Sequence, residues 1–151
     1  MDVQQFKELF AGLTDFKENQ YHPLVCITGE PVIGSRVYIG AFSEINAKNV
    51  SVTIGDDCDI ASFVSINCAD SHLRCIEHKD DVSRKSIVIQ SHVFVGSHSV
   101  IKGGAIIGHH TVVAAGTVVD GLEIPPFSLV SGNPMTIKAG YYKRIKRSDT
   151  T

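Results

Sequence analysis

A polar segment between Cys68 and Ser86 gathers side chains that could carry out acid–base chemistry. An imidazole titrates near neutral pH, so it can take a proton from a hydroxyl or amino group as that group attacks an acyl carbon. A carboxylate two positions earlier, as Asp70 stands to His72, can orient the ring. The segment therefore predicts a general-base site with either His72 or His78 as the base. Its titratable and charged residues are Asp70, His72, Arg74, Glu77, His78, Lys79 and Asp80.

A structural zinc site is an alternative for the same segment. Cysteine and histidine are the usual ligands of structural zinc, and they normally come in pairs separated by a longer stretch of chain. Here the possible ligands are compressed into a single short run, which favours the general base. The possible ligands are Cys68, His72, Cys75 and His78.

The segment interrupts a regular repeat of six residues. An aliphatic residue recurs at every sixth position from Ile33 to Ile45, again from Ile54 to Ile66 and, after the interruption, from Ile89 to Val119, and a small residue very often follows. A period of six matches neither a helix nor simple strand alternation, but it is typical of a parallel β-helix with three flat sides per coil. A β-sandwich would need turns at longer and less regular intervals. The repeated positions are Ile33, Ile39, Ile45, Ile54, Ile60, Ile66, Ile89, Val95, Ile101, Ile107, Val113 and Val119.

The ends of the chain predict different structure. Apolar residues from Phe6 to Phe16 lie at helical spacing, so we expect an amphipathic helix that caps the first coil or contacts a neighbouring subunit. Pro125 and Pro126 are expected to end the repeats, and residues 131–134 to form a turn. The basic tail over residues 141–147 predicts a short, solvated helix. We expect one domain over residues 1–151, with an N-terminal helix in 1–22, a β-helix over 33–124 interrupted at 68–86, and a C-terminal turn and tail over 125–151.

Composition limits the possible classes of protein. The net charge of −2 gives no general attraction to nucleic acid, and no stretch is long and apolar enough to cross a bilayer. The N-terminus lacks the pattern of a signal peptide. Four cysteines without a C-x-x-C pair predict reduced thiols and a cytoplasmic location.

The repeats of the form Ile-Gly-x-x-Val-x, the loop with the Ser71-His72 step and the closing Gly132-Asn133-Pro134 resemble the hexapeptide-repeat acyltransferases. The most similar branch holds the maltose, galactoside and lipopolysaccharide O-acetyltransferases. This resemblance, which covers about residues 33–137, implies a left-handed β-helix and a homotrimer. It also implies acetyl-CoA bound between subunits and a histidine general base. The handedness rests on the resemblance alone, because periodicity does not determine it.

The resemblance also assigns roles to residues. His72 stands where the family places its base, just after the chain leaves the coil. Asp70 either orients His72 or binds a sugar hydroxyl. The expected substrate-binding residues are Asn67, Arg74 and His78. The stretches Val95-Gly96-Ser97-His98 and Ala114-Ala115-Gly116 match those that contact the pantetheine arm of CoA. The expected cofactor-binding residues are therefore Ser97, Ala115 and Gly116, with Lys138 as a substitute for missing basic residues.

The chain departs from the family pattern at three places. Gln90 stands where the repeat has glycine. Asp120-Gly121 replaces a common Thr-Lys, and Met135-Thr136 replaces Ala-Lys or Ala-Arg after Gly-Asn-Pro. The last two changes remove basic partners for the CoA phosphates, which leaves the binding of the cofactor open.

Two other function classes share this fold. A zinc enzyme of the carbonic-anhydrase type would need two histidines where this chain has Ser97 and Lys102, and His92, His98, His109 and His110 fall at other phases of the repeat. A non-catalytic trimeric scaffold would have no reason to interrupt its repeats with a polar loop. We therefore expect an acetyl-CoA-dependent acyltransferase without a metal. It would acylate a hydroxyl or amino group of a sugar or nucleotide sugar for a surface polysaccharide, by direct transfer rather than through an acyl-cysteine.

Overall fold

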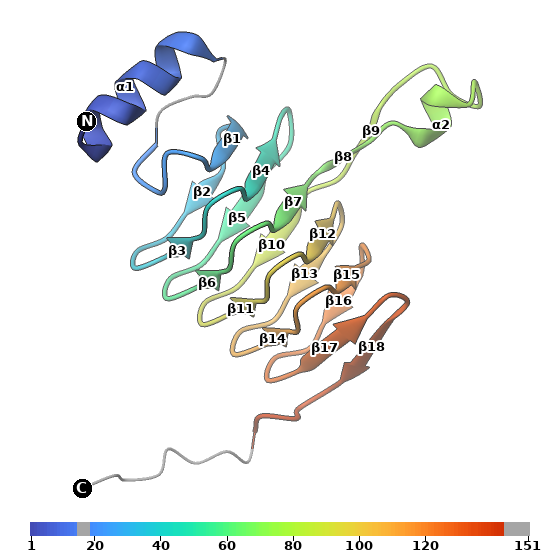
Figure 1. The fold of residues 1–151 in the computed structure, drawn as a ribbon. Helices are drawn as coiled ribbons and strands as arrows, with labels where there is room; N and C mark the ends of the chain where they lie inside the picture. The colour runs from blue at the N-terminus through green and yellow to red at the C-terminus, as the bar shows by residue number, and fades with distance from the viewer. Residues whose placement is uncertain (15–18, 144–151) are drawn as a thin grey trace, which may run out of the picture.

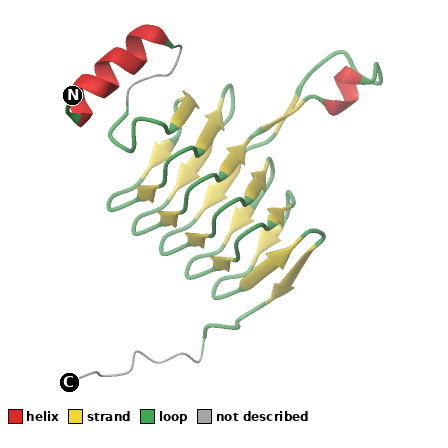
Figure 2. Ribbon diagram, viewed as in Figure 1, coloured by secondary structure: helices red, strands yellow, loops and turns green. Residues whose placement is uncertain are grey.

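The computed structural model describes residues 1–14 and 19–143, and most of them form a left-handed parallel β-helix of about five turns. Each turn passes through three sheets in succession, so the cross-section is a triangle with three corners (Figure 1). Both helices lie outside this coil, at the N-terminus and at the tip of a projecting arm (Figure 2). The predicted fold class is thereby confirmed.

The three sheets, here called A, B and C, stack strands from successive turns side by side. Sheet A contains β1 (Cys26–Gly29), β4 (Glu44–Ala47), β7 (Ser65–Asn67), β12 (Val100–Lys102) and β15 (Val118–Val119). Sheet B contains β2 (Val32–Ile33), β5 (Val52–Ile54), β10 (Ile87–Ile89), β13 (Ile106–Ile107) and β16 (Glu123–Ile124). Sheet C contains β3 (Tyr38–Ile39), β6 (Asp59–Ile60), β11 (Phe94–Val95), β14 (Val112–Val113), β17 (Leu129–Gly132) and β18 (Met135–Lys138).

The repeated aliphatic residues form the core. In sheet A, Ile45 lies beside Ile66, and Ile66 beside Ile101, in a column that runs up the inside of the coil. Eleven of the twelve predicted inward positions are buried, and Ile33 in the first turn is partly buried. The prediction is therefore confirmed. Successive side chains of a strand point to opposite faces, so a residue between two outward-facing neighbours points into the interior.

The corners bury hydroxyl groups as well as apolar atoms. Ser43 donates to the carbonyl oxygen of Ala61 at 2.9 Å, Thr117 donates to Ala114 at 2.6 Å, and Ser128 donates to Pro125 at 2.6 Å. Among the described residues, no buried side-chain nitrogen or oxygen lacks a hydrogen-bond partner. Small hydroxyl residues at these positions therefore satisfy the carbonyl groups that the turning chain leaves unpaired.

Glycine is required where neighbouring coils meet most closely. A Cβ atom added to Gly96 would lie 2.5 Å from the backbone nitrogen of Ala115 in the next coil. That distance is far shorter than a van der Waals contact, so the two coils would have to separate. The small residue that follows the aliphatic one thus sets the spacing of the stack.

Two of the corners carry ladders of exposed or partly exposed side chains on residues with positive φ. The histidine corner, between sheets B and C, stacks Asp57, His92, His110 and Phe127 in successive coils. The phenylalanine corner, between sheets C and A, stacks Phe42, Phe63 and His98, with ring centroids 5.0 and 4.9 Å apart. Left-handed backbone is unfavourable for residues with a Cβ, and the stacking of rings between coils offsets part of that cost.

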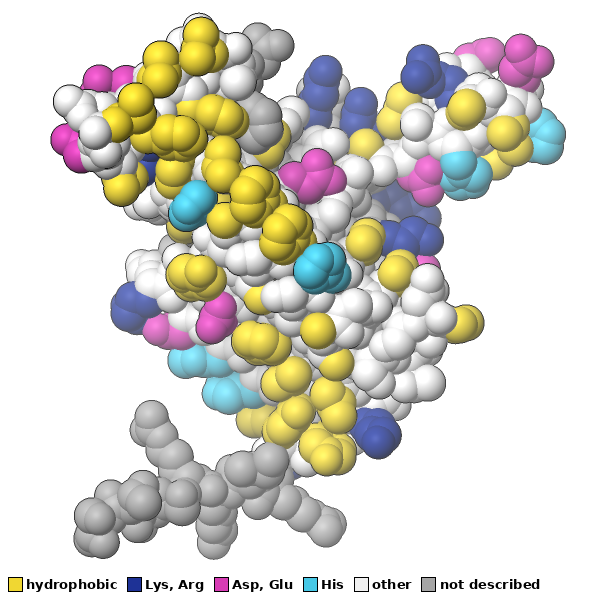
Figure 3. Space-filling view, viewed as in Figure 1, with side chains coloured by type: hydrophobic (Ala, Val, Ile, Leu, Met, Phe, Trp, Pro, Cys, Tyr) yellow, Lys and Arg dark blue, Asp and Glu magenta, His cyan; other side chains and the backbone are white. Residues whose placement is uncertain are grey.

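The N-terminal helix α1 (Val3–Leu13) lies beside the first coil (Figure 1). Asp2 caps it by accepting from the Gln5 backbone at 2.8 Å, and the Gln5 side chain accepts from Asp2 in return. No residue of the helix is buried, and Leu9 is 47% exposed. Figure 3 accordingly shows hydrophobic side chains gathered over this element and the coil next to it. Phe16, the last residue of the predicted apolar stripe, lies outside the described residues.

The C-terminal end extends the coil beyond the expected range. Pro125 and Pro126 do not end it, because β17 follows them as a further strand of sheet C. The turn at Asn133–Pro134 then reverses the chain into β18, which pairs antiparallel with β17. The prolines occupy a corner, where proline needs no ladder hydrogen bond. Residues 141–143 of the predicted basic helix form a turn, and the rest of it lies outside the described residues.

Candidate active site

The interruption of the repeats is a narrow arm, defined here as residues 68–86, which projects from the corner between sheets A and B (Figure 1). Two short strands, β8 (Ala69–Asp70) and β9 (Ser83–Arg84), pair antiparallel and form its stalk. A single helical turn, α2 (His72–Cys75), follows the first strand. At the base, the Lys85 backbone donates to the carbonyl oxygen of Cys68 at 3.0 Å, so the arm leaves and rejoins the coil at one point.

His72 and Asp70 form a hydrogen-bonded pair at the start of the arm. Nδ1 of His72 lies 2.5 Å from Oδ1 of Asp70, and the same oxygen accepts from the His72 backbone at 3.0 Å. Asp70 ends β8, and the turn into α2 brings the histidine two residues later back over its carboxylate. The two residues that the sequence predicts as catalytic are therefore in contact.

This pairing determines which nitrogen of His72 can act as a base. An ionised carboxylate can only accept hydrogen bonds, so Nδ1 must carry the proton and Nε2 keeps its lone pair. The hydrogen bonds from the His72 side chain and backbone hold the pKa of Asp70 below its ordinary value. Asp70 is therefore ionised throughout the neutral range, and it can stabilise the imidazolium that forms when Nε2 takes a proton.

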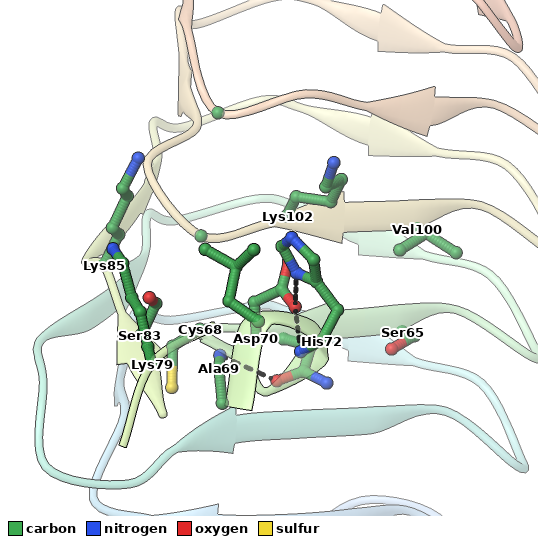
Figure 4. Close-up of a pocket in the computed structure, with 14 residues that line it drawn as sticks. Ser65, Cys68, Ala69, Asp70, His72, Lys79, Ser83, Lys85, Val100 and Lys102 are labelled. Carbon is green, nitrogen blue, oxygen red and sulfur yellow. Dashed lines mark hydrogen bonds and ion pairs between the residues drawn. The ribbon is translucent and has the colours of Figure 1, made fainter. Parts of the chain in front are cut away.

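A pocket of about 550 Å³ opens beside the pair, between the arm and the coil (Figure 4). One wall consists of outward-facing residues of sheet A, Ser65 and Val100, and its floor includes Gly103 and Gly121. The arm supplies the opposite wall. The lining residues are Ser65, Asn67, Cys68, Ala69, Asp70, His72, Leu73, Lys79, Ser83, Lys85, Val100, Lys102, Gly103 and Gly121.

Asn67, one of the expected substrate-binding residues, lines this pocket but also holds the arm in place. Its side-chain oxygen accepts from the Ala69 backbone at 2.9 Å and from Asn46 of the preceding coil at 3.2 Å. These contacts fix the direction in which the chain leaves sheet A. Arg74 and His78 are exposed on the outer part of the arm and are not among the residues that line the pocket.

Three lysines line the pocket although the sequence did not predict them as site residues. Lys79 and Lys85 come from the arm, and Lys102 from the end of β12. Lys102 lies beside Asn67 in the strand register although it is 35 positions away in sequence. The one available signal was the six-residue phase, which aligns the end of β12 with the end of β7. The phase shows that both residues end a strand, but it does not show that the two strands are neighbours across the arm.

The expected cofactor-binding residues form a separate group. Ser97 lies at the phenylalanine corner, and its carbonyl oxygen accepts from the backbone of Gly116 in the next coil at 2.9 Å. Ala115 and Gly116 are exposed beside it, and a Cβ on Gly116 would meet nothing within 4 Å. The phenylalanine corner lies at the N-terminal ends of the strands of sheet A, and the arm leaves from their C-terminal ends. Within one chain, the expected cofactor-binding residues and the His72 pocket therefore lie on opposite sides of that sheet. Lys138 lies apart from both, on β18.

The cysteines occupy two kinds of environment. Cys58 is buried in the core as its phase predicts, and burial raises the pKa of its thiol. Cys68 is buried at the base of the arm, whereas Cys75 is exposed on α2 and does not line the pocket. All four cysteines lie in the described part of the chain and are free thiols. No group of three or more histidine, cysteine or acidic side chains within residues 1–14 and 19–143 is arranged as metal ligands.

Comparison with known proteins identifies the repeats. Residues 32–68 and 86–121 match the family described as the hexapeptide repeat of succinyl-transferase. The polysialic acid O-acetyltransferase of Escherichia coli O1:K1 is 43% identical over 109 residues, which cover 70% of this chain and 35% of that enzyme. The chain thus carries the hexapeptide repeats of this family and shares them with an O-acetyltransferase.

Solved structures extend the similarity of this hexapeptide-repeat protein to three dimensions. The polySia-specific acetyltransferase NeuO superposes with a TM-score of 0.66 at 32% identity, over 80% of this chain and 52% of NeuO. The hexapeptide-repeat acetyltransferase VCA0836 of Vibrio cholerae, solved with acetyl-CoA, gives a TM-score of 0.57 at 26% identity, over 91% of this chain and 76% of that one. The chain thus spans about a third of the polysialic acid enzyme and about half of NeuO. Among the described residues, no helix could cross a membrane.

Proposed function

We propose that this protein is a CoA-dependent acyltransferase that transfers an acetyl group to a hydroxyl or amino group of a sugar or nucleotide sugar. The observation that carries the proposal is the His72–Asp70 pair, which opens into a pocket large enough for a sugar at the point where the repeats are interrupted. The similarity to acetyltransferases of the same fold supports it, among them one solved with acetyl-CoA. Cytoplasmic synthesis of a surface polysaccharide is the setting that this activity would serve.

In the proposed reaction, Nε2 of His72 takes the proton from the acceptor as its oxygen or nitrogen attacks the thioester carbon. The bond from that carbon to sulfur then breaks, and CoA leaves as the thiolate, which recovers the proton from the imidazolium. Asp70 keeps the ring in the tautomer that this step needs and stabilises its charged form. No covalent enzyme intermediate is required. Cys58 is buried in the core, Cys75 lies outside the pocket, and Cys68, which lines the pocket, is only 2% exposed, so these positions fit direct transfer.

We further propose that the complete site forms between subunits of a homotrimer. His72 and the small residues at Ser97 and Ala115 lie at opposite edges of sheet A in one chain, so the arm of one subunit would have to meet the phenylalanine corner of another. The exposed rings of Phe42 and Phe63 at that corner suit such a contact. Light scattering or sedimentation would measure the mass, and a monomer would contradict a shared site.

The decisive experiment is a thiol-release assay with acetyl-CoA and a panel of sugars, comparing the wild type with His72→Ala. Removal of a general base typically lowers the rate by about 10²- to 10⁴-fold, and binding of acetyl-CoA should be unaffected. His92→Ala is the matched control, because His92 is exposed at the distant histidine corner. If His72→Ala stays active and His78→Ala does not, His78 is the base. If the wild type neither binds acetyl-CoA nor releases thiol, the protein is not an acyltransferase.

A further inference from the structure

The pocket beside His72 is positively charged although the chain as a whole carries a net charge of −2. Two lysines of the arm and one from β12 line it, against Asp70 as the single acidic residue in the lining. Figure 3 shows basic side chains gathered where the arm meets the coil, next to an acidic and a histidine side chain. A local excess of one charge inside a concave site concentrates ligands of the opposite charge.

Two of these lysines have no partner of opposite charge within the described chain. Lys102 Nζ lies 3.1 Å from Asp120, and Asp70 is engaged with His72. No described carboxylate pairs with Lys79 or Lys85. Two cations thus remain uncompensated on the arm side of the pocket. Since like charges repel when brought together, such a cluster is most stable when an anion binds it.

The coil surface also has room for the stem of Lys85. A Cβ added to Gly104 would lie 3.3 Å from Cδ of Lys85, so the side chain passes directly over this glycine. In Figure 4, Lys85 and Lys102 extend to either side of the His72 ring. The stem of Lys85 therefore lies against the coil at the pocket, while the residue as a whole remains exposed.

The phosphates of CoA are a poor match for this anion site. In acetyl-CoA the long pantetheine arm separates the thioester from the phosphates. If the thioester is at His72, as transfer requires, the phosphates lie well outside the pocket that contains His72. An anion in the same pocket as the reacting atoms has to belong to the acceptor.

We propose that the acceptor carries an anionic group, a carboxylate or a phosphate, which Lys85 and Lys79 bind while the hydroxyl or amino group faces His72. This inference rests on the proposed acyltransferase function. The substrate class is then an acidic or phosphorylated sugar rather than a neutral one. A lysine serves here as a point charge, so either a carboxylate or a phosphate is accommodated.

The test compares acceptors that differ only in the anionic group: N-acetylneuraminate against its methyl ester, and glucose 6-phosphate against glucose. Each is assayed by thiol release with the wild type, Lys85→Gln, Lys79→Gln and the control Lys143→Gln. Lys143 is exposed at the far end of the chain and changes the net charge equally. We expect the wild type to prefer the acids. Each pocket substitution should raise their KM about tenfold, the scale of one charge-assisted hydrogen bond. The KM of acetyl-CoA should stay constant.

The outcomes distinguish a failure of this inference from a failure of the proposed acyltransferase function. Equal use of neutral and anionic acceptors by the wild type overturns the inference and leaves the acyltransferase intact. A rise in KM for acetyl-CoA alone assigns the lysines to CoA and also overturns it. If no acceptor is acetylated, the proposed function fails. Calorimetry with N-acetylneuraminate and glucose 6-phosphate then tests the anion site. The site requires that these acids bind to the wild type, and that Lys85→Gln weakens this binding whereas Lys143→Gln does not.

Discussion

The coil and the arm are built by different physical means. The coil buries column upon column of isoleucine and valine, and each strand lies beside its counterpart in the neighbouring turn. The arm has one pair of two-residue strands and one helical turn, and between Ala69 and Ser86 no residue is buried. The coil is thus held by repeated burial of apolar surface, and the arm by a few local hydrogen bonds. The difference teaches that stability and the proposed chemistry lie in separable parts of the chain.

The largest test of this separation removes the arm. Replacing residues 68–86 by Gly-Gly copies Gly103 and Gly104, which join the corresponding strands one turn later. We expect a folded coil with a melting temperature within a few degrees of the wild type, because shortening a surface loop costs little and Cys68 is the one buried residue that is replaced. Acceptor-dependent thiol release should vanish completely. Circular dichroism and the thiol assay measure the two effects, and loss of the β signal would show that the arm helps to hold the coil.

A change in the core should have the opposite effect. Ile101 is fully buried in sheet A, whereas the neighbouring Ile106 is 39% exposed. Ile101→Ala should lower the free energy of unfolding by about 2–5 kcal/mol, as expected for a cavity left by a buried aliphatic side chain. Ile106→Ala, the matched control, should cost less than about 1 kcal/mol. Urea denaturation measures both. Equal losses would mean that the columns inside the coil do not dominate its stability.

Within the arm, the hydrogen bond between Asp70 and His72 can be altered by a substitution that keeps the shape of the Asp70 side chain. Asp70→Asn allows the amide to donate to Nδ1, which places the ring proton on Nε2 and removes the base. We expect kcat to fall by at least about tenfold and by no more than it falls in His72→Ala. The melting temperature should not change, because both side chains are exposed. Asp81→Asn, on the outer arm, is the control, and an undiminished kcat in Asp70→Asn would leave Asp70 with no positioning role.

The smallest effect is expected at the histidine corner. Desolvation by the rings stacked on it, and then the charges of His92 and His109, lower the pKa of His110. Below about pH 6.5 the unfolded chain therefore binds more protons at this position than the folded one, and stability falls as the pH is lowered.

His110→Gln should reduce this acid sensitivity, measured as the difference in unfolding free energy between pH 7.5 and pH 5.5. The change should be less than about 1 kcal/mol, because the residue is exposed to solvent. His78→Gln on the arm should leave the difference as it is. A pH dependence that is unchanged in His110→Gln would assign the effect to other groups.

Much of the coil could be predicted because its signal is local. Ile101 can be predicted to face inward because it lies in a short strand just before the chain turns a corner. The period of six is therefore enough to identify such inward-facing residues. The extension of the coil to β17 was harder to predict. Ile124 follows Val119 after five positions instead of six, so Val130 falls one position out of phase with the repeats before it.

The site divides in the same way. The sequence by itself brought Asp70 and His72 together, since two residues around one turn are neighbours in almost any fold. Only the tertiary structure placed Lys85 and Lys102 at the same pocket and Ser97 at the opposite edge of sheet A. The physical reason is the register between coils. Successive turns lie side by side whatever the length of chain between them. An excursion such as the arm therefore changes the sequence separation of paired residues, from 21 positions for Asn46 and Asn67 to 35 for Asn67 and Lys102, without altering the repeat itself.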